Sequence, residues 1–241
     1  MPPIPIDDAT LLNAWEATTA LARPWREVVL LAGVSGEPVD VLARLPIGER
    51  DRRLLVMRTA ALGERLDCET PCPACGERLE MALESPALAC PAVDAGSTSV
   101  LEDGGWRVRF RLPTSADLAA CLGEPAAGRA LLASCVVEAA EGDVRRPPQE
   151  LPPHLCEELS ARMAALDPQA DVRLALECPA CGHGWQADLD VGAFVLAEVD
   201  AHAARLLGEV HGLARAYGWS EADILALSTA RRRRYLELAW S

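Results

Sequence analysis

The pentapeptide CPACG occurs twice in this chain, at Cys72–Gly76 and at Cys178–Gly182. Two cysteines separated by two residues place two thiolates at one tight turn, which is half of the ligand set of a structural zinc ion. The glycine that follows lets backbone amides approach the sulfurs. Two such turns complete a set of four thiolates. The repeat therefore predicts that two turns about a hundred residues apart meet in space.

The ligands of the predicted zinc ion are Cys72, Cys75, Cys178 and Cys181. A zinc ion bound by both turns closes a loop of about a hundred residues, and roughly 10 kcal/mol of its binding free energy becomes folding free energy. We therefore expect one structural zinc ion per chain. We also expect similar losses of stability from Cys72→Ser and Cys178→Ser.

Other interpretations of these cysteines remain open at the level of sequence. They can be reduced surface cysteines, or a degenerate site that has lost its metal. Cys68 and Cys90 flank the first turn and can join Cys72 and Cys75 in a separate site, which would leave the second turn with only His183 as a further ligand. A redox role is disfavoured because a redox CxxC usually opens a helix after a strand.

Strands are predicted on both sides of each turn, because apolar and polar residues alternate there. The residues expected on the apolar face of these strands are Leu79, Met81, Leu83, Val172, Leu174, Leu176, Trp185, Ala187, Leu189 and Val191. Each CPACG is thus expected at the turn of a β-hairpin. A further strand is predicted over Trp106–Leu112, followed by a helix capped by Thr114 or Ser115.

Most of the remaining chain is predicted to be helical. The expected helices cover residues 9–22, 24–33, 48–63, 128–140, 153–166 and 191–217, with Arg52, Arg53 and Arg58 solvated on the third. Gly218 ends the longest helix, and shorter helices begin at Ser220, with Asp223 in a capping box, and at Ser228. The proline-rich loop 141–153 is expected to be flexible.

The predicted fold class is α+β, mostly helical, with a small zinc-ribbon-like antiparallel β core made from the two CPxCG hairpins. An N-terminal helical segment covers residues 1–65. The split β core with a helical insertion covers 66–191, and a C-terminal helical segment covers 192–241. We expect the three to be integrated into one domain.

The net charge of the chain limits the classes of partner that it can bind. Its formal net charge is −13 and its pI is about 4.8, so the molecule as a whole repels nucleic acid and anionic membranes. The N-terminus is acidic where a signal peptide is basic, and the longest apolar run, Val28–Val34, is too short to cross a membrane. We expect a cytoplasmic protein that binds no membrane.

No motif of a catalytic site stands out. The sequence contains no phosphate-binding glycine loop, nucleophile elbow or convincing carboxylate pair, so we predict that the protein is not an enzyme.

The C-terminal basic cluster has three interpretations. It comprises Arg231, Arg232, Arg233 and Arg234, followed by Tyr235. The arginines can be a solvated helix face, a surface for an acidic protein partner, or a nucleic-acid contact, which the net charge disfavours. We expect a protein partner here, with an apolar face of Ile224, Leu225, Leu227, Tyr235 and Leu238, although packing of that face in the core is an equal alternative.

Several segments together resemble the T4-like phage baseplate hub assembly proteins, which occur with contractile phage tails and related contractile injection systems. They are LPIGERDRRLLVMRTAALGERL, the first CPACG, FRLPTSADL, LPPHL, DPQADVRLALECPACGHGWQADLD and YGWSEADILALSTARRRRYLEL. The resemblance implies a non-enzymatic structural, assembly or chaperone role in building a baseplate or its hub, with protein partners. It implies no functional residues beyond the cysteines.

Two rival functions come from other classes. A zinc-ribbon nucleic-acid-binding regulator is favoured by the four cysteines and the arginine cluster, and disfavoured by the net charge. A zinc-dependent hydrolase would need an open coordination position, which four thiolates do not leave.

Overall fold

The structure is a computed structural model that describes residues 6–94 and 96–240. About half of these residues are helical, fewer than the mostly helical fold predicted. The helices are α1 (Asp8–Glu16), α2 (Trp25–Ser35), α3 (Val39–Leu42), α4 (Ile47–Leu62), α5 (Ser85–Leu88), α6 (Ser115–Ala120), α7 (Ala127–Cys135), α8 (Pro153–Leu166), α9 (Val191–Tyr217), α10 (Glu221–Leu225) and α11 (Thr229–Ala239), with 3₁₀ turns η1 (Pro148–Glu150) and η2 (Pro168–Ala170).

The strands of the described residues form three separate antiparallel sheets. Their bounds are β1 (Arg65–Pro71), β2 (Arg78–Glu84), β3 (Ser99–Asp103), β4 (Trp106–Phe110), β5 (Val136–Glu141), β6 (Val144–Arg145), β7 (Val172–Glu177) and β8 (Gly184–Leu189). Two hairpins, β1–β2 and β7–β8, stand apart from a four-stranded meander, β3–β4–β5–β6. The antiparallel hairpins around both CPACG turns agree with the prediction, but they do not join into one β sheet.

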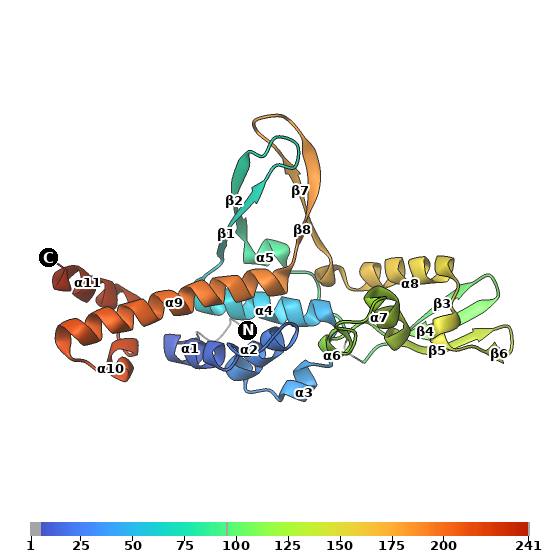
Figure 1. Cartoon of the computed structure of the whole chain (residues 1–241), viewed down its shortest axis with the longest axis horizontal. Coiled ribbons are helices and arrows are strands. Elements are labelled where there is room, and N and C mark those ends of the chain that lie inside the picture. The colour runs from blue at the N-terminus through green and yellow to red at the C-terminus, as the bar shows by residue number, and fades with distance from the viewer. Residues whose placement is uncertain (1–5, 95, 241) are drawn as a thin grey trace.

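A helical hub occupies the middle of the elongated molecule (Figure 1). It consists of α1, α2, α4 and the first half of α9, which surround the largest apolar core. Leu30 on α2, Leu54 on α4 and Val195 on α9 are fully buried there. Amphipathic spacing explains these helices, because each turns one apolar stripe towards the others.

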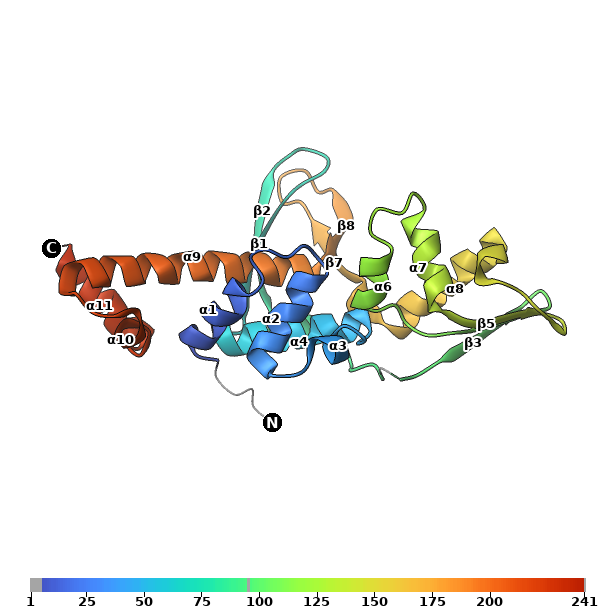
Figure 2. The ribbon, with the colours of Figure 1, turned by 60° about the horizontal axis from the view of Figure 1, so that its bottom comes forward.

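Both hairpins rise from the same side of the hub (Figures 1 and 2). Their bases pack on the hub core through Leu66 and Leu83 from the first hairpin and Val172 and Leu189 from the second. Within each hairpin these apolar residues lie opposite one another, Leu66 against Leu83 and Val172 against Leu189. The alternating pattern thus fixes the register of each hairpin and places both CPACG turns at the outer end.

The β3–β6 sheet and helices α7 and α8 form one end of the molecule (Figure 1). Phe110 on β4 and Leu159 on α8 are fully buried in the second apolar core. The helix predicted over residues 128–140 is wrong in its second half, because α7 ends at Cys135 and Val136–Glu141 is β5. The β-branched Val136 and pairing with β4 outweigh the helix preference of the alanines that follow.

Helix α9 runs from the hub to the opposite end of the molecule, where α10 and α11 pack beside it (Figure 2). Its predicted bounds are confirmed, and Gly218 adopts φ 70° at its C-terminal cap. The predicted capping box of Ser220 and Asp223 and the N-cap Ser228 are also present. No helix among the described residues is long and apolar enough to span a membrane.

Two arginines that the sequence placed at the surface are buried. Arg58 is 3% exposed and binds the Glu198 carboxylate with two N–H groups, at 2.8 and 2.7 Å. Arg232 is 1% exposed, binds Glu209 at 2.8 Å and also contacts the Asp8 carboxylate. The prediction that Arg58 is solvated is wrong. Arg232 likewise lies in the interior, so it is not part of a surface that could contact a partner.

Candidate metal centre

The two CPACG turns meet at the outer end of the hairpins. The sulfurs of Cys72, Cys75, Cys178 and Cys181 all lie within 4.8 Å of one another. Cys72 Sγ is 3.8 Å from Cys181 Sγ, and Cys75 Sγ is 3.7 Å from Cys178 Sγ. The first cysteine of each turn therefore faces the second cysteine of the other turn, and the four residues named from the sequence come together.

The two turns have the same backbone structure. The Gly76 amide donates to the Cys72 carbonyl at 2.9 Å, and the Gly182 amide donates to the Cys178 carbonyl at 2.8 Å. Both glycines have positive φ, 77° and 72°, a conformation that residues with a Cβ rarely adopt. This requirement explains why the glycine recurs in both pentapeptides.

Backbone amides point at the sulfurs and shift the acidity of the thiols. Burial raises the pKa of Cys72, but hydrogen bonds from the amides of Cys75 and Ala74 outweigh it and lower the pKa to about 7. The amide of Glu77 lowers the pKa of Cys75, but hydrogen bonding with the Cys181 and Cys178 thiols outweighs this effect and raises it to about 12. The pKa of Cys72 is therefore lowered and that of Cys75 is raised.

Burial divides the four cysteines into two inner and two outer residues. Cys72 and Cys178 are 2% and 1% exposed, whereas Cys75 and Cys181 are exposed. Leu79 and the partly buried Met81 and Trp185 pack beside the inner pair. A small apolar cluster therefore covers one side of the sulfurs, and the other side faces solvent.

The arrangement fits a tetrahedral zinc ion. Zinc–thiolate bonds of about 2.3 Å give sulfur–sulfur separations of about 3.8 Å in a regular tetrahedron. The two cross-turn separations are 3.8 and 3.7 Å. Four thiolates are also the donors that zinc and iron–sulfur sites select, and a single tetrahedron of this kind is typical of structural zinc.

Cys68 and Cys90 do not join the cluster. Cys68 lies on β1 and packs against the hub core, and the amide of Cys90 donates to Gln169 at 2.7 Å. Among the described residues, the four CPACG cysteines are the group of close potential metal ligands. The geometry for a separate site around the first turn is therefore missing.

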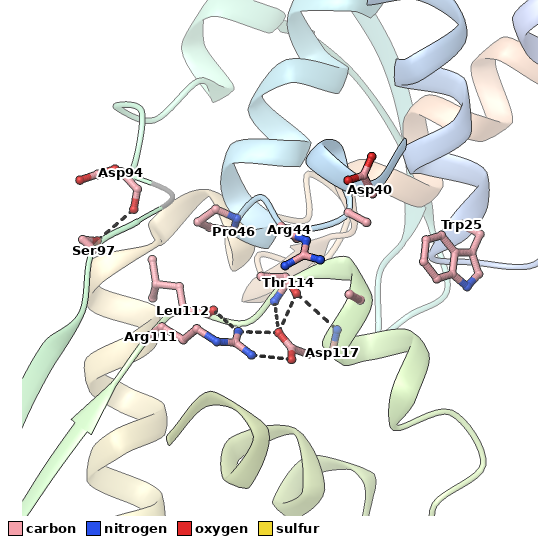
Figure 3. A pocket seen from close by; sticks show the side chains of 12 residues that line it. Trp25, Asp40, Arg44, Pro46, Asp94, Ser97, Arg111, Leu112, Thr114 and Asp117 are labelled. Carbon is pink, nitrogen blue, oxygen red and sulfur yellow. Dashed lines mark hydrogen bonds and ion pairs between the residues drawn. The ribbon is translucent and has the colours of Figure 1, made fainter. Parts of the chain in front are cut away.

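Away from the cysteines, a pocket lies between α2, α3, α6 and the chain after α5 (Figure 3). It is a half-open pocket of about 480 Å³, and Arg111 and Asp117 form an ion pair in its wall. Arg111 binds both carboxylate oxygens of Asp117, at 2.6 and 2.7 Å, and Thr114 also donates to that carboxylate. These contacts hold the start of α6 against the end of β4. Sequence reasoning identified Thr114 as a cap but did not predict this pocket.

Comparison with known proteins identifies a family that the chain matches. A family model described as "T4 bacteriophage base plate protein" matches residues 28–191. The matched segment begins in α2, contains both CPACG turns and the β3–β6 sheet, and ends at the first residue of α9. No curated protein and no solved structure matches the chain.

Proposed function

We infer the function from one premise: the chain belongs to the T4 bacteriophage base plate protein family. We propose that it is a non-enzymatic structural or assembly component of the baseplate, or baseplate hub, of a contractile phage tail or related injection system. Assembly then takes place in the cytoplasm of the producing cell. The observation that carries the proposal is the family match, which covers both hairpins and the sheet that lies between them in sequence.

The proposed cofactor is one structural zinc ion held by Cys72, Cys75, Cys178 and Cys181. The support is the fit of the sulfur–sulfur distances to a zinc tetrahedron and the amides aimed at the sulfurs. When bound, the ion supplies four metal–thiolate bonds that fasten one hairpin to the other. The chain's own contribution is to orient the four sulfurs and to cover the inner pair with apolar side chains.

A structural role follows from the ligand set. Four protein ligands fill a tetrahedral zinc ion and leave no position for water or substrate. In the pocket of Figure 3, the charged groups of Arg111 and Asp117 are likewise bound to each other. The nucleic-acid-binding alternative receives no comparable support, and the net charge of −13 opposes it.

The test of the function is removal of the gene from the phage or tail gene cluster that encodes this chain. We expect electron microscopy to find tail tubes or sheaths without finished baseplates, and we expect the wild-type gene to restore them. Complete, working baseplates in the deletion strain would contradict the proposal. Mass spectrometry of purified wild-type particles distinguishes a retained component from an assembly factor that leaves.

A further inference from the structure

The end of the molecule formed by residues 203–240, here called the C-terminal tip, carries a cluster of aromatic rings. Trp219 stacks on Tyr217 with ring centroids 4.7 Å apart and meets Tyr235 edge-on at 4.9 Å. The Tyr217 hydroxyl donates to the Tyr235 carbonyl at 3.1 Å. Tyr217 is 37% exposed, and Trp240 at the end of α11 is 75% exposed. The rings thus form an ordered surface that the chain leaves partly uncovered.

The tip is held in one arrangement from its interior side. Arg232 on α11 is buried and bonds to Glu209 on α9, to Asp8 on α1 and to the Leu227 carbonyl. Ile224 on α10 is fully buried, which at this residue agrees with the alternative that the apolar face packs in the core. Because the tip is already ordered, binding there costs little conformational entropy.

Positive charge gathers on the same end of an otherwise acidic protein. Residues 203–241 contain six arginines and four acidic residues, whereas the whole chain contains 23 basic and 36 acidic residues. Arg215, Arg231 and Arg233 form no ion pair with any residue that the structure describes. Arg234 pairs only with Glu237 on its own helix, and both side chains are largely exposed. The tip therefore carries guanidinium groups without ion-pair partners among the described residues, on the two helices, α9 and α11, that also carry Tyr217 and Tyr235.

The tip lies outside the segment that the family model matches. The family match ends at Val191, whereas the tip begins at residue 203 and lies at the far end of α9 (Figures 1 and 2). Its interior contact, Asp8, also lies outside the match. The tip thus lies beyond the matched segment, at the end of α9 that projects away from the hub.

We propose that the C-terminal tip binds an acidic segment of a protein partner. Carboxylates of that segment pair with the exposed Arg215, Arg231 and Arg233, and one of its apolar side chains packs on Tyr217, Trp219 and Tyr235. Charge complementarity selects this occupant: a second copy brings six arginines of its own, and nucleic acid, being long and anionic, meets the acidic remainder of the molecule. Assigning the partner to the baseplate rests on the proposed function, whereas the acidic chemistry rests on the tip alone.

The experiment places a photoreactive residue at the tip of the full chain in the producing cell. Trp240→p-benzoylphenylalanine reports on the tip, and Val144→p-benzoylphenylalanine, on exposed β6 at the other end, is the matched control. We expect a crosslink from position 240 to a protein segment of net negative charge, identified by mass spectrometry. Adding Arg231→Glu and Arg233→Glu should reduce this crosslink at least tenfold, whereas Arg107→Glu and Arg145→Glu on the distant sheet should not.

Four outcomes overturn the inference: no crosslink at position 240, a neutral or basic partner segment, a second copy of this chain, or nucleic acid. The identity of the crosslinked protein tests the function separately. An acidic segment from a protein outside the tail particle supports the tip inference and contradicts the baseplate role. Loss of baseplates in the deletion strain, with no crosslink at position 240, supports the role and contradicts the inference.

Discussion

The backbone amide of Gly48 donates a hydrogen bond to Asp167 Oδ2 at 2.9 Å, although 119 residues separate the two in sequence. Gly48 is the second residue of α4, so Asp167 satisfies one of the amides that a helix start leaves without a partner. A Cβ at position 48 would lie 1.8 Å from Asp167 Oδ1. The hub and the segment before the second hairpin are therefore joined by a contact that only glycine allows.

We expect Gly48→Ala to lower the free energy of unfolding by about 2 kcal/mol, as overpacking of a buried site does. Asp167 is 2% exposed, so its carboxylate has little room to move aside. The matched control is Gly208→Ala on α9, where a Cβ meets nothing within 4 Å. That substitution should stabilise the protein by about 0.5–1 kcal/mol, because alanine favours a helix interior. Denaturant unfolding measures both, and equal effects would contradict the assigned contact.

Local signals in the sequence account for the parts that were predicted. Each CPACG contains its own turn, its own ligands and the glycine with positive φ, and alternation beside it sets a hairpin. Helix α9 ends at Gly218 because that residue adopts the left-handed conformation of a helix cap. Strand β3 was missed although Gly104 and Gly105, both with positive φ, form the turn before Trp106 and are a hairpin signal.

Long-range contacts account for the parts that were not predicted. Arg58 and Arg232 are charged residues of the type usually found at solvated helix positions. Their carboxylate partners lie 140 and 23 residues away in sequence, and Arg232 has a further partner in Asp8. Gly48 likewise gives no hint of Asp167. Helical spacing identifies which residues share a face, but it does not identify which remote carboxylate neutralises a buried cation.

Substitution of the cysteines tests the metal centre. We expect purified wild-type protein to hold one zinc ion per chain by elemental analysis, and Cys72→Ser and Cys178→Ser each to lose it, because both are inner members of the sulfur cluster. Cys68→Ser, on the same hairpin but outside the cluster, should keep its zinc. Zinc loss in Cys68→Ser, or two zinc ions in the wild type, would contradict the single shared site.

Removal of the metal should loosen the hairpins before the hub. The hairpins are separate two-stranded sheets that meet at the cysteines and a small apolar cluster, and a lone hairpin is only marginally stable. With a zinc chelator, we expect amide hydrogen exchange at residues 70–82 and 174–187 to accelerate at least tenfold. Exchange in α4 and the first half of α9 should change little. Loss of protection across the hub would instead mean that closure of the long loop holds the whole fold.

Ionisation of Asp51 should lower the free energy of unfolding as the pH rises. Burial raises the pKa of Asp51 to about 6 from its ordinary 3.8, although Arg50 beside it acts in the opposite direction. The folded chain holds this proton more tightly than the unfolded chain, so the contribution is full below about pH 3.8 and is lost as the pH rises through 6. The difference in unfolding free energy between wild type and Asp51→Asn should fall by about 2 kcal/mol from pH 4 to pH 7.

Asp117 provides the control of opposite sign for that experiment. Burial raises the pKa of Asp117, but hydrogen bonds from Arg111 and Thr114 outweigh it and leave the pKa below its ordinary 3.8. Its contribution is therefore present above about pH 3.8 and is lost as the pH falls through the lower folded value. Differences that change in the same direction for Asp51→Asn and Asp117→Asn would refute the assigned environments.

Arg231 and Arg232 are neighbours with opposite roles in the C-terminal tip. Arg232→Met removes the cation between Glu209 and Asp8, and breaking a buried pair in this way costs about 3–5 kcal/mol. We expect faster hydrogen exchange throughout α11 in this variant. Arg231→Met, at an exposed position with no ion pair among the described residues, should change stability by less than about 0.5 kcal/mol.

Both variants should weaken the crosslink from position 240, Arg232→Met because the tip loses its order and Arg231→Met because an ordered tip loses a contact. Equal exchange in α11 of the two variants would contradict this division between an anchoring and a docking arginine.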